Sequence, residues 1–237
     1  MSRRRWLLAT LWLGGCDTVF GLERGDADVA QPVTYIQSSS AGAAQVSKLA
    51  LSLAAKPLQP GDLIAVAVGT YNGDAFTLAD SAGNVYRRTG GATNTTVSSL
   101  SVLYAVNVVA SEDLIVTATV DNAQSDSEIS MAAHVYRGAH SEPFEVRAVG
   151  AGVSSMPESS AISLTTVEDR VLFAALVHEE SNTVSSPGPR FTRREGVNET
   201  IGVQLTTEDS IGSELPPAAT FGLTAKTSWA CEGSVFH

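Results

Sequence analysis

The sequence predicts an all-β protein, a two-sheet antiparallel β-sandwich of jelly-roll type, and three observations lead to this fold class. Hydrophobic residues make up 43% of the 237 residues and charged residues 17%, which leaves enough apolar material for a sizeable core. From Val33 onward, short runs rich in Val, Leu, Ala, Ser and Thr alternate with turn residues, as strands do. No stretch longer than ten residues keeps a helical period, although residues 41–55 leave room for one turn.

The predicted strands differ in how many of their faces are apolar. In residues 62–71, DLIAVAVGTY, both alternating faces are apolar, which predicts a strand buried on both sides. In residues 100–108, LSVLYAVNV, one face is apolar and the other carries a serine and an asparagine. Residues 113–120 and 128–136 behave similarly, and such short strands are typical of a sandwich.

The second half of the chain repeats the plan of the first. Three pairs of segments match in the same order, at offsets of 107, 101 and 100 residues: 61–72 with 168–179, 100–106 with 201–207, and 129–137 with 229–237. Each half is too small to bury its own faces, so we expect one shared core with an internal pseudo-repeat.

The N-terminus reads as an export signal that ends at a cysteine. Arg3–Arg5 precede the apolar run WLLATLWL at residues 6–13, a pattern typical of a secretory signal. This run is too short to span a bilayer, which takes roughly 20 apolar residues. The sequence Leu13-Gly14-Gly15-Cys16 follows, and it resembles the lipobox of bacterial lipoproteins.

The lipobox resemblance implies thioether lipidation of Cys16, cleavage just before it, and N-acylation of the new terminus. The chemistry suits these residue types, because the thiolate is the nucleophile that takes the lipid. Two or more acyl chains then hold a protein stably on a membrane, whereas one chain does not. The alternatives are a plain signal peptide with an incidental cysteine and, for the export route, a twin-arginine signal, which residues 2–7 resemble.

The same interpretation divides the chain into three parts and locates it. Residues 1–15 are the lipoprotein signal peptide, residues 16–32 the lipidated N-terminus and tether, and residues 33–237 the β-sandwich domain. We expect a lipid-anchored protein of the cell envelope, at the outer membrane or cell surface rather than the inner membrane. Asp17 argues the other way, because it resembles the inner-membrane retention signal of enteric lipoproteins.

The chain is acidic, and this limits its partners. Its formal net charge is −10, and the loss of three arginines with the signal peptide changes it to −13. Without a basic patch the chain cannot release counterions from phosphates, so nucleic acid is excluded as a partner. We expect contact with the membrane through the Cys16 lipid, and with an envelope or extracellular polysaccharide or protein.

The middle of the chain resembles a module of many secreted bacterial proteins. The resemblance rests on Gly61-Asp62-Leu63, on LADSAGNVY at residues 78–86, and on a final strand near the C-terminus. That module often accompanies repeat, adhesion or polysaccharide-acting domains. The resemblance therefore implies a fold, and it carries over no functional residues.

The sequence offers no catalytic pattern, and we expect no enzyme. It lacks HExxH, GxSxG, P-loop and GxGxxG motifs, and its acids show no E-x-D-x-E spacing on a strand. Cys231 reads as a buried core thiol. His178-Glu179-Glu180 reads as a solvated strand end, with a catalytic or metal role as the alternative.

Two sets of residues are candidates for ligand binding. Calcium is the best cofactor candidate, because hard cations favour oxygen clusters, although Asp and Asn are also simply turn formers. An aromatic platform for glycans is the second candidate, although these rings can instead cap the core. The calcium candidates are Asp74, Asp80, Asn84, Asp121, Asp126 and Glu128, and the platform candidates are Tyr71, Phe76 and Tyr86.

Together these observations predict a lipid-anchored cell-envelope protein with a non-catalytic binding or structural β-sandwich. The first alternative is a carbohydrate-binding or adhesin lipoprotein that uses the aromatic platform. The second is a polysaccharide-acting hydrolase, which needs two carboxylates set across a cleft.

We predict that Cys16→Ser leaves the fold intact and moves the protein from the membrane to the soluble fraction, or leaves an unprocessed precursor. The reason is that the substitution removes the thiol that takes the lipid, while the tether lies outside the predicted core. Fractionation and mass spectrometry of the wild-type N-terminus test this. A mature N-terminus at another residue, or an unmodified Cys16 peptide, contradicts the lipobox interpretation.

Overall fold

The computed structural model describes residues 32–71, 75–121, 127–164, 169–179, 183–197 and 202–237. Within them every regular element is a β-strand and every strand pairing is antiparallel, so the predicted all-β antiparallel class is confirmed. None of these residues belongs to a helix long and apolar enough to cross a membrane. The chain divides into Met1–Ala30 and Gln31–His237, and the fold below is that of the second unit.

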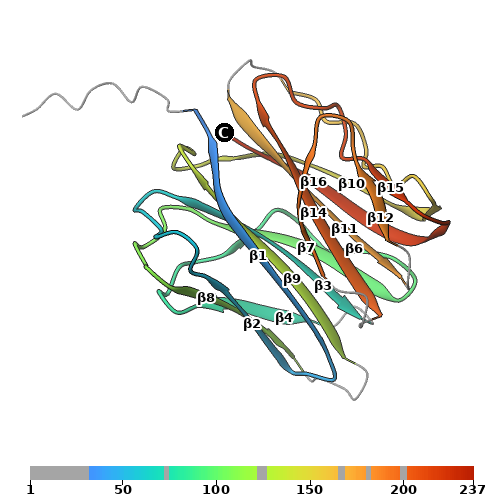
Figure 1. The fold of residues 1–237 in the computed structure, drawn as a ribbon, viewed down its shortest axis with the longest axis horizontal. Helices are drawn as coiled ribbons and strands as arrows, with labels where there is room; N and C mark the ends of the chain where they lie inside the picture. Colours follow the sequence, from blue (N-terminus) through green and yellow to red (C-terminus); the bar gives the residue numbers. More distant parts are fainter. Residues whose placement is uncertain (1–31, 72–74, 122–126, 165–168, 180–182, 198–201) are drawn as a thin grey trace, which may run out of the picture. The chain divides into compact units, whose positions relative to one another are not determined.

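The strands of the first half form two sheets, coloured blue to yellow-green in Figure 1. The first large sheet has six strands. Five of them follow one another in this order: β1 (Thr34–Ala44), β9 (Glu128–Arg137), β3 (Leu63–Tyr71), β7 (Ser98–Ala105) and β5 (Arg87–Arg88). The sixth, β6 (Thr93–Asn94), also pairs with β7. The first covering sheet has three strands: β2 (Lys48–Leu53), β8 (Leu114–Val120) and β4 (Phe76–Asp80).

The strands of the second half form two further sheets, coloured ochre to red in Figure 1. The second large sheet has five strands in this order: β10 (Phe144–Ser154), β16 (Thr227–Phe236), β11 (Arg170–Glu179), β14 (Val203–Gly212) and β13 (Thr192–Gly196). The second covering sheet has two strands: β12 (Val184–Pro187) and β15 (Phe221–Leu223).

Three apolar cores hold these sheets together in layers. One face of β3, including Val66, packs with residues of the first covering sheet. The opposite face of β3, including Ala65, packs with Phe173 of the second large sheet. The far face of the second large sheet, including Leu172, packs with the second covering sheet. β3 is therefore buried on both sides, as residues 62–71 predict.

The number of sheets differs from the two that the sequence predicts, because the described residues form four. When two apolar sheets pack face to face, each still has an apolar outer face, and a further sheet must cover it. The two large sheets have corresponding strand orders, and the three matched segment pairs lie on β3 and β11, β7 and β14, and β9 and β16. The internal pseudo-repeat and the jelly-roll type themselves stay predictions.

A buried polar chain links the two large sheets. Thr207 Oγ1 on β14 lies 2.7 Å from His134 Nε2 on β9, and His134 Nδ1 lies 3.0 Å from the Tyr136 hydroxyl. Tyr136 donates to Asp209, which is ion-paired with Arg194. Because the tyrosine proton is used there, Nδ1 of His134 donates and Nε2 accepts. Burial, with a smaller effect of Arg194, lowers the pKa of His134 to about 3 and keeps the ring neutral.

We predict that Gly150→Ala lowers the free energy of unfolding by about 1–3 kcal/mol, the usual cost of overpacking. A Cβ at Gly150 on β10 would lie 2.1 Å from the carbonyl oxygen of Glu158, so the backbone must shift. The matched control is Gly91→Ala, because a Cβ there meets nothing within 4 Å. Urea denaturation of both variants checks this, and equal midpoints would show that β10 and residue 158 do not pack closely.

Candidate functional site

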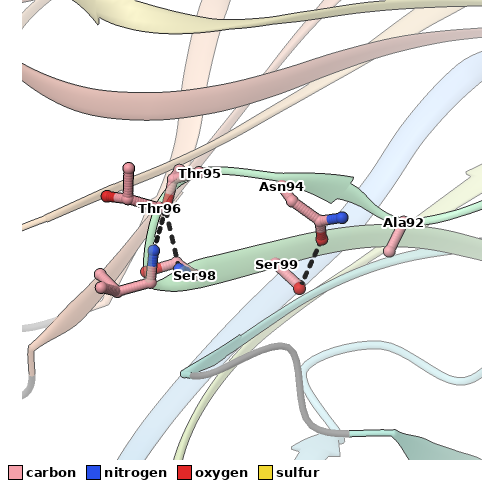
Figure 2. Close-up of a pocket in the computed structure, with 7 residues that line it drawn as sticks. Ala92, Asn94, Thr95, Thr96, Ser98 and Ser99 are labelled. Carbon is pink, nitrogen blue, oxygen red and sulfur yellow. Dashed lines mark hydrogen bonds between the residues drawn. The ribbon is translucent and has the colours of Figure 1, made fainter.

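A pocket of about 390 Å³ opens at the hairpin between β6 and β7 (Figure 2). Its volume falls in the range of small-molecule sites, roughly 300–1,000 Å³. We call it the hairpin pocket. Its described lining consists of one alanine, one valine and five side chains with a hydroxyl or an amide: Ala92, Asn94, Thr95, Thr96, Val97, Ser98 and Ser99.

The local sequence, TNTTVSS at residues 93–99, fixes the shape of this hairpin. Thr95 Oγ1 accepts hydrogen bonds from the backbone amides of Val97 at 3.1 Å and Ser98 at 2.7 Å. Ser99 Oγ donates to Asn94 Oδ1 at 2.7 Å across the strand pair, and Figure 2 shows these three bonds as dashed lines. Short polar side chains that bond their own backbone favour tight turns. The pocket wall is therefore built before any ligand arrives.

Glu179, at the end of β11, joins the hairpin to the second large sheet. Its Oε1 accepts hydrogen bonds from the hydroxyls of Thr95 at 2.9 Å and Thr96 at 3.1 Å. No lysine or arginine is among the described residues that line the pocket. Arg147 nevertheless lies beside the pocket, because its guanidinium donates hydrogen bonds to the Gly91 carbonyl and, at 2.9 Å, to Thr93 Oγ1. Charges of both signs therefore border the pocket.

Ser98 supplies an unused polar group at the pocket. The residue is 3% exposed, and its Oγ has no hydrogen-bond partner among the described residues. A buried hydroxyl without a partner costs about 1–3 kcal/mol, and a ligand that bonds to it recovers that cost. The amide nitrogen of Asn94 takes no part in the hairpin bonds, so its two donors also remain for a ligand.

The three aromatic residues of the predicted platform lie in different places. Tyr71 is half-buried at the end of β3 and is the cross-strand partner of Ser98. Phe76 is 8% exposed, and the Arg88 guanidinium lies 4.6 Å from its ring centroid. Tyr86 packs against the same core as Phe76, whereas Tyr71 packs against the core between the large sheets. The structure thus brings Tyr71 near the hairpin pocket and leaves the other two elsewhere.

Asp80, a calcium candidate, is occupied by its own turn. Its Oδ1 accepts the backbone amides of Ala82 and Asn84, each at 3.0 Å. Its Oδ2 accepts the Asn84 side-chain amide at 2.8 Å and the Tyr86 hydroxyl at 2.9 Å. The pKa of Tyr86 is raised, first by burial and then by the Asp80 charge, so the phenol stays a donor. The Asp80 and Asn84 pair therefore acts as a turn former.

The other calcium candidates give no cluster either. Glu128 Oε2 accepts the backbone amide of Val203 at 2.9 Å, and Asp121 is exposed. Asp74 and Asp126 lie outside the described residues. In the described parts of the chain, no three His, Cys, Asp or Glu side chains could hold a metal ion together. A calcium site stays a prediction without support from this geometry.

The interpretation of His178 as a solvated strand end is wrong, because the residue is 1% exposed. It lies on the face of β11 that packs toward the second covering sheet, opposite Gln204 of β14. Burial lowers the pKa of His178 to about 4. Cys231 is fully buried in the core beneath the same sheet, and burial raises the pKa of its thiol to about 12, so the predicted core thiol is confirmed.

Glu208, on β14, is a buried acid that sequence reasoning missed. It is 0% exposed, and its Oε2 accepts the Gly188 amide at 3.2 Å. Its Oε1 has no hydrogen-bond partner in the described structure. Burial raises the pKa of Glu208 to about 8. The surrounding sequence, QLTTEDS, looks like an exposed strand edge, which hides this burial.

We predict that Glu208→Gln has a higher free energy of unfolding than wild type, and that the difference between the two grows as the pH rises from 5 to 8. The unfolded chain loses the Glu208 proton near pH 4.5 and the folded chain near pH 8, so wild-type stability falls through this window. The difference grows by up to about 1.4 kcal/mol per pH unit. Urea denaturation across this range measures it.

Glu142→Gln is the matched control, because the Glu142 side chain is 76% exposed. Its free energy of unfolding should match that of wild type at every pH. If the free energies of unfolding of Glu208→Gln and wild type change in parallel with pH, Glu208 carries its charge in the folded protein.

The chain matches no protein-family model, and no curated protein and no solved structure matches it either.

Proposed function

We propose that this chain is a lipid-anchored cell-envelope protein whose β domain is a non-catalytic binding module, with the hairpin pocket as its binding site. One observation carries the proposal: the pocket is lined by five side chains with a hydroxyl or an amide, and the Oγ of one of them, Ser98, is buried without a hydrogen-bond partner among the described residues. Buried polar groups normally have a hydrogen-bond partner, and a group without one needs an explanation. A ligand that supplies the missing bond is that explanation.

The anchor in this proposal comes from the sequence. Cys16, at the end of Leu13-Gly14-Gly15-Cys16, carries the lipid, and residues 16–32 tether the domain to the membrane. The ligand is then a component of the envelope or of the surface beyond it, a polysaccharide or a protein. We also infer from the corresponding strand orders that the domain is an internal pseudo-repeat of jelly-roll type.

The chemistry of the pocket suits binding better than hydrolysis. Serine, threonine and asparagine side chains donate and accept hydrogen bonds, but near neutral pH they do not exchange protons as an acid and a base must. A glycoside hydrolase needs two carboxyl groups about 5–10 Å apart across the scissile bond. Glu179 is the carboxylate that the described residues place at this pocket, and two threonine hydroxyls already bond it.

We predict that Ser98→Ala weakens binding of the detergent-purified full-length protein to immobilised, delipidated envelope fragments about five- to tenfold. The substitution removes one hydrogen-bonding hydroxyl, worth about 1 kcal/mol, and adds no atom to a buried position. Retention on the beads as a function of protein concentration measures this. The control is Thr77→Val, on the exposed face of β4, which should bind as wild type does. Equal binding of wild type and Ser98→Ala would refute the assignment of the pocket as the binding site.

A further inference from the structure

The outer edge of β1 presents a row of backbone groups that the sheet itself does not pair. β1, drawn in blue in Figure 1, is the outermost strand of the first large sheet, and its ladder partner is β9. The Gln45 amide donates to the Ser127 carbonyl at 2.7 Å, which continues this ladder by one position. Backbone bonding alternates along an antiparallel pair. The odd-numbered residues from 37 to 45 therefore bond to β9, and the even-numbered ones point their amides and carbonyls away from it.

Four residues carry these outward backbone groups: Ser38, Ser40, Gly42 and Ala44. In the part of the chain that the structure describes, no backbone hydrogen bond reaches them. Gly42 and Ala44 are exposed. The hydroxyls of Ser38 and Ser40 both donate to the carboxylate of Glu195 on β13, so these side chains turn toward the second large sheet. The edge is therefore open to a further strand.

The other edges of the two large sheets are protected, whereas β1 is not. Proteins protect sheet edges with short strands, charged side chains or a covering segment. At the opposite edge of the first large sheet, β5 is two residues long and both are arginine. In the second large sheet, β13 has three charged residues among five, and the Ser160 amide donates to the Val149 carbonyl at the edge of β10.

β1 has eleven residues and contains neither a charged residue nor a proline. Its register shift, between Tyr35 and Gln37, lies before the outward row and leaves that row regular. A long, regular and uncharged edge is a template for strand pairing. Such an edge is explained by a strand that adds to it.

The outward row is complementary to a second copy of itself. When two β1 strands run antiparallel about a two-fold axis at Ala41, Ser38 faces Ala44 of the second copy and Ser40 faces Gly42. Each outward residue then exchanges two backbone bonds with its counterpart, which gives about eight hydrogen bonds. Serine, glycine and alanine are small and uncharged, so no side chain of this row obstructs the approach. The two Ala41 residues form a non-hydrogen-bonded pair, with Cα atoms roughly 4.5 Å apart.

We propose that β1 is a dimerisation edge, at which a second copy of this chain adds its own β1 and joins the two first large sheets into one. The interface is isologous, as in most two-fold dimers. It lies at the opposite edge of the sheet from β6, so each copy keeps its hairpin pocket, and the inference does not rest on the proposed function. Each copy has a net charge of −10 while the edge is uncharged, so added salt should strengthen the dimer by screening the repulsion between copies.

A cysteine at the two-fold axis tests the pairing in the purified full-length protein. In Ala41→Cys the two thiols meet within the Cα separation that a disulfide accepts, roughly 4.4–6.8 Å, so mild oxidation should give a covalent dimer on a non-reducing gel. Ala43→Cys is the matched control, because Ala43 lies on the same face of β1 and packs against the same core. Its two copies would lie roughly 14 Å apart, so it should stay monomeric.

Wild type oxidised in the same way accounts for the native thiols, of which Cys231 is buried. Cross-linking of both variants to the same extent, or of neither, would overturn the proposed pairing.

Gly42→Pro tests the same interface without a cross-link. Its amide points outward, and proline is tolerated where the sheet does not use the amide. Sedimentation equilibrium in a detergent matched in density to the buffer should show a monomer–dimer equilibrium for wild type, with more dimer at higher salt. Gly42→Pro should weaken the dimer at least about tenfold, because the interface loses two symmetry-related hydrogen bonds. It should keep the far-UV circular dichroism spectrum of wild type. A wild type that is monomeric at every concentration, or a dimer that Gly42→Pro leaves unchanged, would contradict the proposal.

Discussion

The face-to-face contact of the two large sheets is the constraint on which the rest of the structure depends. A Cβ at Gly69 of β3 would lie 2.8 Å from Val177 of β11, so the two sheets approach more closely there than a side chain allows. Alanines such as Ala67 and Ala175 line the same core. Because both sheets are apolar on their outer faces too, each needs a covering sheet, and the four-layer arrangement follows.

Polar side chains inside this contact limit how the sheets can be placed on one another. His134 and Thr207 bond across it, and Glu232 is fully buried with Arg147 at 2.9 Å and a hydrogen bond from Thr89. A shift of one sheet by one residue would break these bonds and leave buried polar groups unpaired, at a cost of about 1–3 kcal/mol each. The hairpin pocket depends on this placement, because Glu179 and the hairpin come from different sheets.

Strand alternation in the sequence predicts which faces are buried but not what covers them. The two apolar faces of residues 62–71 predict the burial of β3, and the same alternation places Cys231 in a core. The sequence does not show that a separate sheet covers each outer face. It therefore predicts two sheets, whereas the described residues form four. The pocket is harder to predict than the sheets, because Thr95 and Glu179 are 84 residues apart and meet through tertiary packing alone. The run TNTTVSS is the part of the sequence that could have indicated the pocket, but such a run is equally typical of an ordinary turn.

The order of strands in the first large sheet also defines a path for mechanical force. In the anchored protein that we propose, the membrane pulls through the tether on β1, while a bound ligand pulls on the hairpin of β6 and β7. The tension then crosses the β1–β9, β9–β3 and β3–β7 hydrogen-bond ladders one after another, within a single sheet. A second path for the force runs from Thr95 and Thr96 of the hairpin, through their hydrogen bonds to Glu179, into β11. Under tension the two hydrogen bonds to Glu179 join the second half of the chain to the first at the point where the ligand is held.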